Sequence, residues 1–155
     1  MKKLILFLFC SLITSISYAQ DEATVTMDEC WLEHNVYVNN QKGMKICCNL
    51  NVEQMRGKTL CVIAYFYYDD GENTPIKSRT GNNKYRTRDN QVCTGDYAYA
   101  KYDSTYWDGF TLFLPYRELN SAVSCSSDLS CIISVQSKSG IPYAASEVMT
   151  FTFNK

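Results

Sequence analysis

The chain has 155 residues, of which 46% are hydrophobic and 20% are charged, and its 15 basic and 16 acidic residues give a net charge of −1. This length suits one domain built around a single core. The balanced charge excludes the strongly basic surfaces that are typical of proteins binding nucleic acids or anionic membranes.

Residues 1–19 have the three parts of a secretory signal sequence: a basic start at Lys2 and Lys3, an apolar run over residues 4–16, and a small-x-small cleavage site ending at Ala19. The apolar run is shorter than the roughly 20 residues that span a membrane. We expect cleavage after Ala19, which leaves a secreted or periplasmic domain at residues 20–155 with 13 basic and 16 acidic residues, a net charge of −3. Cys10 lacks the small preceding residue that lipid attachment requires.

The first half of the mature chain is predicted to be strand-rich. Residues 24–38 are expected to form a strand or a bent pair, and residues 39–43 a turn. Residues 44–52 alternate between apolar and mostly polar side chains, which indicates a strand with one solvent-facing side. A turn at residues 55–58 precedes an apolar run at residues 60–68, typical of a central strand covered on both faces, and we expect these two strands to form a hairpin.

The second half continues this pattern. Residues 69–83 read as a long loop with a short edge strand at Ile76, and residues 85–87 and 91–94 as weak strands around a turn. A strong strand at residues 110–114 ends at Pro115, and residues 116–119 are expected to form one helical turn. The last two strands are predicted at residues 129–136 and 147–153.

Seven to eight short strands with regular turn signals predict an all-β fold, a two-sheet antiparallel β-sandwich of immunoglobulin-like architecture. A small barrel is the competing topology. No segment of ten or more residues in the mature chain has a convincing helical stripe.

Four segments resemble a recurrent small β-sandwich accessory module of gut-bacterial proteins, which occurs in secreted, repeat-containing or peptidase-associated chains. They are residues 31–37, 42–46, 64–67 and 110–119, and the resemblance spans most of residues 24–153. It implies a non-catalytic role, because no activity is assigned to these motifs. This chain differs in standing alone behind a signal sequence and in its extra cysteines.

Seven cysteines remain after cleavage, and disulfides are permitted outside the cytoplasm. Cys125 and Cys131 flank a short polar loop and form the simplest possible disulfide, although the connectivity is not fixed by the sequence. An odd number leaves at least one cysteine free or paired with another chain. The alternative is that several are small buried hydrophobic residues. No Cys-x-x-Cys pair occurs, so we predict no metal site and no cofactor.

The strongest candidate for a functional surface is a cluster of aromatic side chains within eleven residues. Tyrosine and tryptophan provide large, rigid contact areas with a polar edge, which suits binding surfaces. The alternative is that these rings pack at a strand edge over the core. We predict a non-catalytic binding module whose partner is an extracytoplasmic protein or a glycan, and whose binding residues are Tyr97, Tyr99, Tyr102, Tyr106 and Trp107.

Three other kinds of chemistry depend on weaker signals. His34 is the single histidine, so a thiol-dependent enzyme would need it as the base, yet no nucleophile motif accompanies it. The acidic loop at residues 69–73 offers oxygen ligands for calcium but lacks the spacing of a twelve-residue calcium loop. Asp103, Asp108 and Glu118 are the carboxylates considered for a glycosidase, which requires two at a fixed separation.

Overall fold

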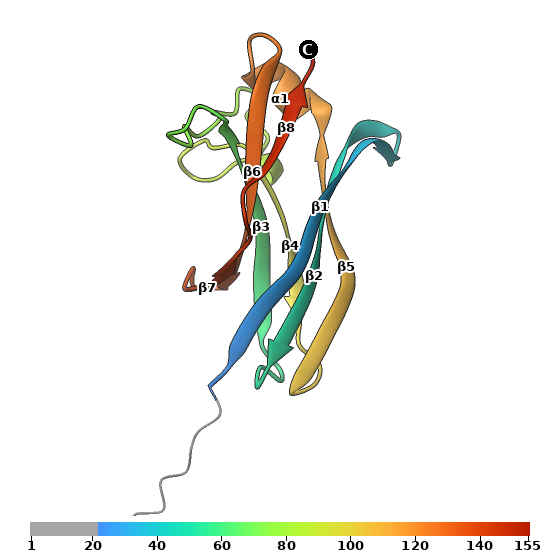
Figure 1. The fold of residues 1–155 in the computed structure, drawn as a ribbon, viewed down its shortest axis with the longest axis vertical. Helices are drawn as coiled ribbons and strands as arrows, with labels where there is room; N and C mark the ends of the chain where they lie inside the picture. Colours follow the sequence, from blue (N-terminus) through green and yellow to red (C-terminus); the bar gives the residue numbers. More distant parts are fainter. Residues whose placement is uncertain (1–21) are drawn as a thin grey trace, which may run out of the picture.

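Within residues 22–155, segments with alternating buried and exposed side chains form eight strands, which make two antiparallel sheets (Figure 1). The computed structural model describes residues 22–155, so the predicted signal sequence lies outside the described residues. The elements are β1 (Thr24–Val38), β2 (Gln41–Glu53), β3 (Thr59–Tyr68), η1 (Asn83–Tyr85), β4 (Cys93–Tyr99), β5 (Ser104–Pro115), α1 (Tyr116–Ala122), β6 (Ser127–Ser137), β7 (Pro142–Ala145) and β8 (Met149–Phe153). The predicted all-β sandwich is confirmed.

The first sheet has three strands in the order β1-β2-β5. β1 and β2 form a hairpin around Asn39 and Asn40, whose φ angles of 49° and 61° suit the two-residue turn that matches strand twist. The turn is shorter than the predicted residues 39–43, because Gln41 already pairs with Val38. β1 is one strand with two irregularities in register, at residues 27–30 and 33–36.

The second sheet has the order β4-β3-β6-β7, and β8 also pairs with β6. β8 lies along the first half of β6 and β7 along the second half, so the two short strands share one side of it. The sequence did not predict β7, a four-residue strand that begins at Pro142.

The predicted hairpin between the second and third strands is wrong. β2 pairs with β1 and β5, whereas β3 pairs with β4 and β6 in the other sheet. The connecting residues are anchored at the end of the sandwich, where Met55 is buried and the Gly57 amide donates to the Ala100 carbonyl over 2.7 Å. This segment therefore carries the chain from one sheet to the other.

The core lies between the two sheets and is filled by their inward-facing side chains. In β2, the residues predicted to face inward are almost completely buried: Met44, Ile46, Cys48, Leu50 and Val52. β3 is central in its sheet, but only its inward side is fully buried, because the other face of the sheet is open to solvent. The prediction that β3 is covered on both faces is corrected accordingly.

One end of the sandwich is closed by α1 and by the long loop between β3 and β4 (Figure 1). The short edge strand expected at Ile76 is reduced to single bridges at Pro75 and Lys77, and Ile76 between them is fully buried and hydrogen-bonded to Phe66 and Val92. The expected strand at residues 85–87 is reduced to a single bridge at Arg86, since Tyr85 belongs to the short helix η1. Between residues 22 and 155, no helix has the length and apolar character needed to cross a bilayer.

Candidate functional site

Tyr97 and Tyr99 lie on the outer surface of β4. Their side chains are 64% and 59% exposed, while Ala98 between them is buried in the core. The predicted alternation of these residues is therefore present in the structure, and both rings extend from the same face of the five-stranded sheet.

The other aromatic residues of the predicted cluster lie elsewhere. Tyr102 is in the connection between the two sheets, and Tyr106 is 53% exposed on the outer surface of β5, opposite Asn51. Trp107 is opposite Leu50 on the inward side of β5 and packs against the core. The five predicted binding residues therefore do not form a single surface, because the chain passes from one sheet to the other within the cluster.

The same outer face carries two further tyrosines that the sequence did not single out, nearer the other end of the sheet, whereas Tyr97 and Tyr99 themselves lie opposite Cys61 and Thr59. Tyr65 and Tyr67 alternate along β3 on the same outer face and are half-buried. Tyr65 is opposite Ile132 of β6. We call this outer surface the tyrosine face, and it consists of Ile63, Tyr65, Tyr67, Tyr97, Tyr99 and Ile132. Period-two alternation within residues 60–68 was the signal that could have identified its β3 members.

The tyrosine face is held in place by the sheet beneath it. Gln136 of β6 hydrogen-bonds the hydroxyl of Tyr65, and burial raises the pKa of that hydroxyl. Lys138 places its ammonium group 6.0 Å from the centre of the Tyr97 ring. At Gly95, an added Cβ would lie 3.0 Å from the carbonyl oxygen of Val62, so glycine permits the close pairing of β4 with β3.

β4 is also an edge strand. It pairs with β3 on one side and has no strand partner on the other within residues 22–155. An edge strand presents backbone N–H and C=O groups along its free side. The exposed tyrosines and this free edge therefore belong to the same element.

The cysteines are free thiols throughout the described part of the chain. Cys125 is exposed in the loop before β6, and its sulfur lies 3.8 Å from the Ser127 hydroxyl. Cys131 is buried on the inward side of β6, opposite Phe66. The predicted Cys125–Cys131 disulfide is not formed, because β6 runs extended from Ser127 and carries Cys131 away from that loop.

Several other thiols lie in the interior. Cys30 and Cys48 are opposite each other on β1 and β2. Burial raises the pKa of Cys48 and of Cys131 to about 12, and that of Cys93 to about 11. Thiols with such pKa values stay protonated at neutral pH, and the protonated thiol is a poor nucleophile.

His34 interacts with an aromatic group rather than a thiol. Its Nδ1 lies 3.1 Å from the hydroxyl of Tyr116, and its ring centre is 5.6 Å from that of Phe151. None of the hydrogen bonds in residues 22–155 joins it to a cysteine. A Cys–His pair of the kind required by a thiol-dependent enzyme is therefore not assembled in the described structure.

Two of the carboxylates considered for glycoside hydrolysis, Asp103 and Glu118, are separated by the length of a strand, and Asp108 is exposed within that strand, five residues and about 17 Å of extended chain from Asp103. Asp103 precedes β5 and Glu118 follows it, and twelve extended residues span about 40 Å. A hydrolytic pair is separated by only about 5–10 Å. Glu118 is buried and accepts hydrogen bonds from Thr80 over 2.5 Å and Arg117 over 3.1 Å, which ties α1 to the β3–β4 loop.

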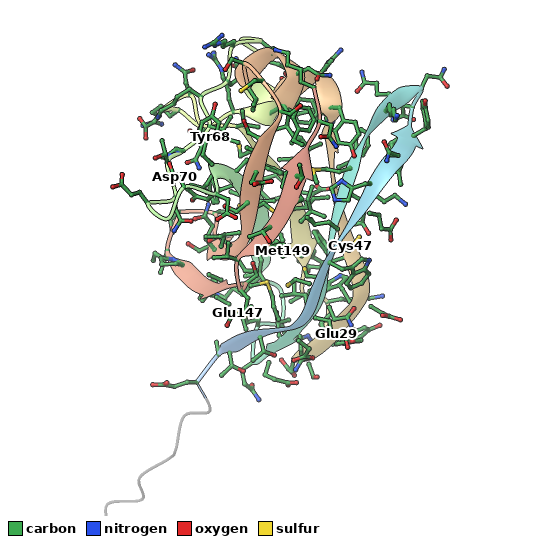
Figure 2. All side chains as sticks on the ribbon, turned by 45° about the horizontal axis from the view of Figure 1, so that its top comes forward. Glu29, Cys47, Tyr68, Asp70, Glu147 and Met149 are labelled. Atoms are coloured by element: carbon green, nitrogen blue, oxygen red, sulfur yellow. The ribbon has the colours of Figure 1, made fainter. Side chains whose placement is uncertain are left out.

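The acidic loop after β3 has a local structural role. Asp70 accepts hydrogen bonds from the backbone amides of Glu72 and Thr74, and hydrogen bonding by Thr74 is the largest cause that lowers its pKa. Figure 2 shows Asp70 at one side of the molecule, with Cys47 in the three-stranded sheet on the other side. No group of three or more metal-ligating side chains converges within residues 22–155.

Comparisons with known proteins give no further guidance: no protein-family model, curated protein or solved structure matches this chain.

Proposed function

We propose that this protein is a non-catalytic, secreted or periplasmic binding module that recognises another protein through the tyrosine face. The observation that carries the proposal is the exposure of Tyr97 and Tyr99 on the outer face of the sheet that also carries the half-buried side chains of Tyr65 and Tyr67. Aromatic side chains that are rigid and partly exposed supply much of the binding energy at protein interfaces. The two-sheet architecture also fits immunoglobulin-like modules, which are frequent in cell-surface proteins.

A protein partner is favoured over a glycan because the exposed tyrosines lie on an edge strand. A polypeptide can add a strand to the free side of β4 while its side chains contact the tyrosine face, and a glycan cannot use the backbone in this way. The resemblance to accessory modules of larger bacterial proteins supports the same kind of role. Carbohydrate binding by the same aromatic residues is the second candidate, supported by the exposure of the Tyr97 and Tyr99 rings.

A thiol-dependent enzyme has little support from the arrangement of the thiols and of His34. Cys48, Cys93 and Cys131 have raised pKa values, and His34 is hydrogen-bonded to Tyr116. General-base activation of a thiol requires the base within hydrogen-bonding distance.

Site-specific photo-crosslinking tests the proposal. We expect a benzophenone side chain at position 99, introduced in the producing cells, to give a covalent adduct with a discrete protein. The second substitution Tyr97→Ala should reduce this adduct several-fold, because it removes the neighbouring contact. The matched control is the same benzophenone at position 106, since Tyr106 has similar exposure but lies on the other sheet.

The same adduct from positions 99 and 106, or no adduct from position 99, would contradict the proposal. Thermal unfolding against a panel of neutral and acidic glycans separates the second candidate. A ligand at a hundredfold excess over its dissociation constant stabilises the native state by about 2.7 kcal/mol. A melting-temperature increase that Tyr97→Ala abolishes and Tyr106→Ala retains would assign the tyrosine face to carbohydrate instead.

A further inference from the structure

A second surface feature lies at the end of the sandwich that carries α1. The β1–β2 hairpin, α1 and the end of β8 surround a cleft of about 620 Å³ there. In Figure 1, α1, β8 and the C-terminus lie at the top of the molecule, where the hairpin projects away from the body of the sandwich. A volume of this order is typical of pockets that bind small ligands.

Aromatic rings form one wall of the cleft. Tyr116, Phe151 and Phe153 line it, and the ring centres of Tyr116 and Phe153 are 5.8 Å apart. The Tyr116 hydroxyl accepts a hydrogen bond from the Asn35 amide over 3.0 Å and lies beside His34 Nδ1. Because Phe153 is buried and Tyr116 is tied to the hairpin, these rings are already positioned before a ligand arrives.

The charged side chains of the cleft are all basic. Lys42, Arg117 and Lys155 line it, and its lining contains no aspartate or glutamate side chain. Arg117 donates to the buried Glu118 through Nε, and its terminal nitrogens make no hydrogen bond within the described residues. Lys155 is held by a 2.8 Å hydrogen bond from Nζ to the Val123 carbonyl. These three basic side chains therefore gather at one cleft in a chain whose net charge is −1.

The nearest side-chain carboxylates offset only part of this cluster: Glu118 forms an ion pair with Arg117, while Lys42 and Lys155 have no carboxylate side-chain partner in the described residues. Glu118 is shared between Arg117 and Thr80, and Asp128 accepts from the Thr152 hydroxyl at the rim. The cleft therefore favours an anionic group, and an arginine guanidinium suits the planar, bidentate recognition of carboxylates and related anions.

Three asparagine side chains complete the lining: Asn35, Asn120 and Asn154. Each amide offers both a donor and an acceptor, which suits hydroxyl groups, whereas a simple inorganic anion needs donors only. Aromatic rings, several amides and basic side chains in one lining together match a sugar ring that carries hydroxyls and a negative charge.

We propose that this cleft binds an acidic saccharide, a sugar unit bearing a carboxylate or a sulfate group. The sugar ring packs against the aromatic wall of Tyr116 and Phe151, its hydroxyls bind the asparagine amides, and its anionic group binds Arg117 and Lys42. This site shares none of the residues of the tyrosine face, so either site can fail its test without affecting the other.

Isothermal titration with defined oligosaccharides tests the proposal on the mature chain. The probes are trigalacturonate, a sulfated heparin tetrasaccharide, the methyl ester of trigalacturonate and sodium sulfate. We expect one or both acidic saccharides to bind, with affinity that falls as salt is added, and the uncharged methyl ester to bind at least about tenfold more weakly.

The variant that localises binding is Lys42→Gln, because Lys42 is exposed and its side chain makes no hydrogen bond or ion pair in the described residues. Its matched control is Lys58→Gln, an exposed lysine in the turn between β2 and β3, which lies at the end of the sandwich opposite α1 in Figure 1. We expect several-fold weaker binding for Lys42→Gln and wild-type binding for Lys58→Gln. Equal loss in both variants, equal binding of the methyl ester, binding of sulfate as tight as that of the saccharides, or no binding of either acidic saccharide would overturn the proposal.

Discussion

Tyr106 and Trp107 are neighbours in the chain with opposite surroundings. β5 is extended here, so successive side chains point to opposite faces of its sheet. Tyr106 is opposite the half-buried Asn51, whereas Trp107 is opposite the fully buried Leu50. An aromatic side chain with a polar edge suits both the surface and the core, so its own type does not indicate which of the two it occupies; the face of the strand on which it lies does.

This difference predicts unequal effects of alanine substitution at the two positions. Trp107→Ala should lower the free energy of unfolding by about 2–4 kcal/mol, because it removes a large ring that packs against the core. Tyr106→Ala should change it by less than about 0.5 kcal/mol, as expected for an exposed side chain. Urea unfolding of both variants measures the difference. Equal, small effects would show that Trp107 is a surface residue, as the sequence had indicated.

At the scale of elements, the pattern of side chains predicts strands better than it predicts their partners. Alternation at residues 44–52 correctly identified both β2 and its inward face. The same pattern contains no information on which strand lies beside β2. A short polar turn that contains glycine has the same sequence features whether it closes a hairpin or connects two sheets. Here the burial of Met55 and the hydrogen bond from Gly57 to Ala100 fix the segment as a connection between sheets, and both depend on contacts with residues distant in sequence.

The same reasoning explains the outcome for the candidate site. The density of aromatic residues in one segment is a property of the chain, whereas a binding surface is a property of neighbouring strands. Tyr97 and Tyr99 were predicted to share a face and do so, while Tyr106 lies across the sandwich. Tyr65 shares their face of the sheet, although the pairing of β3 with β4 places it opposite Cys93, and no local pattern specifies that pairing.

The pairing of β2 with β5 depends on a small residue at one position. A Cβ added at Gly43 would meet the carbonyl oxygen of Leu114 and lie 2.7 Å from Cζ of Phe113. Gly43→Ala should therefore lower the free energy of unfolding by about 2 kcal/mol or more, since backbone must shift to accommodate the methyl group. Chemical denaturation measures this, with the exposed neighbour Lys42→Ala as the control. An unchanged stability in Gly43→Ala would show that the two strands lie further apart.

At the scale of the whole molecule, the two ends and the two outer faces of the sandwich have different characters. The outer face of the five-stranded sheet carries exposed tyrosines, and the end formed by α1, β8 and the β1–β2 hairpin carries basic side chains around aromatic rings. A rigid sandwich can present both at once, because its core holds the strands and its edges and ends are free to vary. Both surfaces are assembled from segments that are distant in sequence, which is why composition alone did not locate them.

The buried thiols make the stability of the whole fold depend on alkaline pH. Burial raises the pKa of Cys48 and Cys131 from an ordinary value of 9.0 to about 12 in the folded state. Above pH 9 the unfolded chain therefore releases protons that the folded chain retains, so the free energy of unfolding falls as the pH rises towards 12. We expect a loss of up to about 1.4 kcal/mol per pH unit for each buried thiol.

Urea unfolding between pH 8 and 10.5 under reducing conditions measures this dependence. Cys131→Ala should make the slope shallower, because alanine has no proton to release, even though the substitution itself lowers stability at pH 8 by removing a buried side chain. Cys125→Ala is the matched control, since Cys125 is exposed and should leave the slope as it is in the wild type. A slope that Cys131→Ala leaves unchanged would mean that the thiol of Cys131 ionises as readily in the folded chain as in the unfolded one, contrary to its position between the sheets.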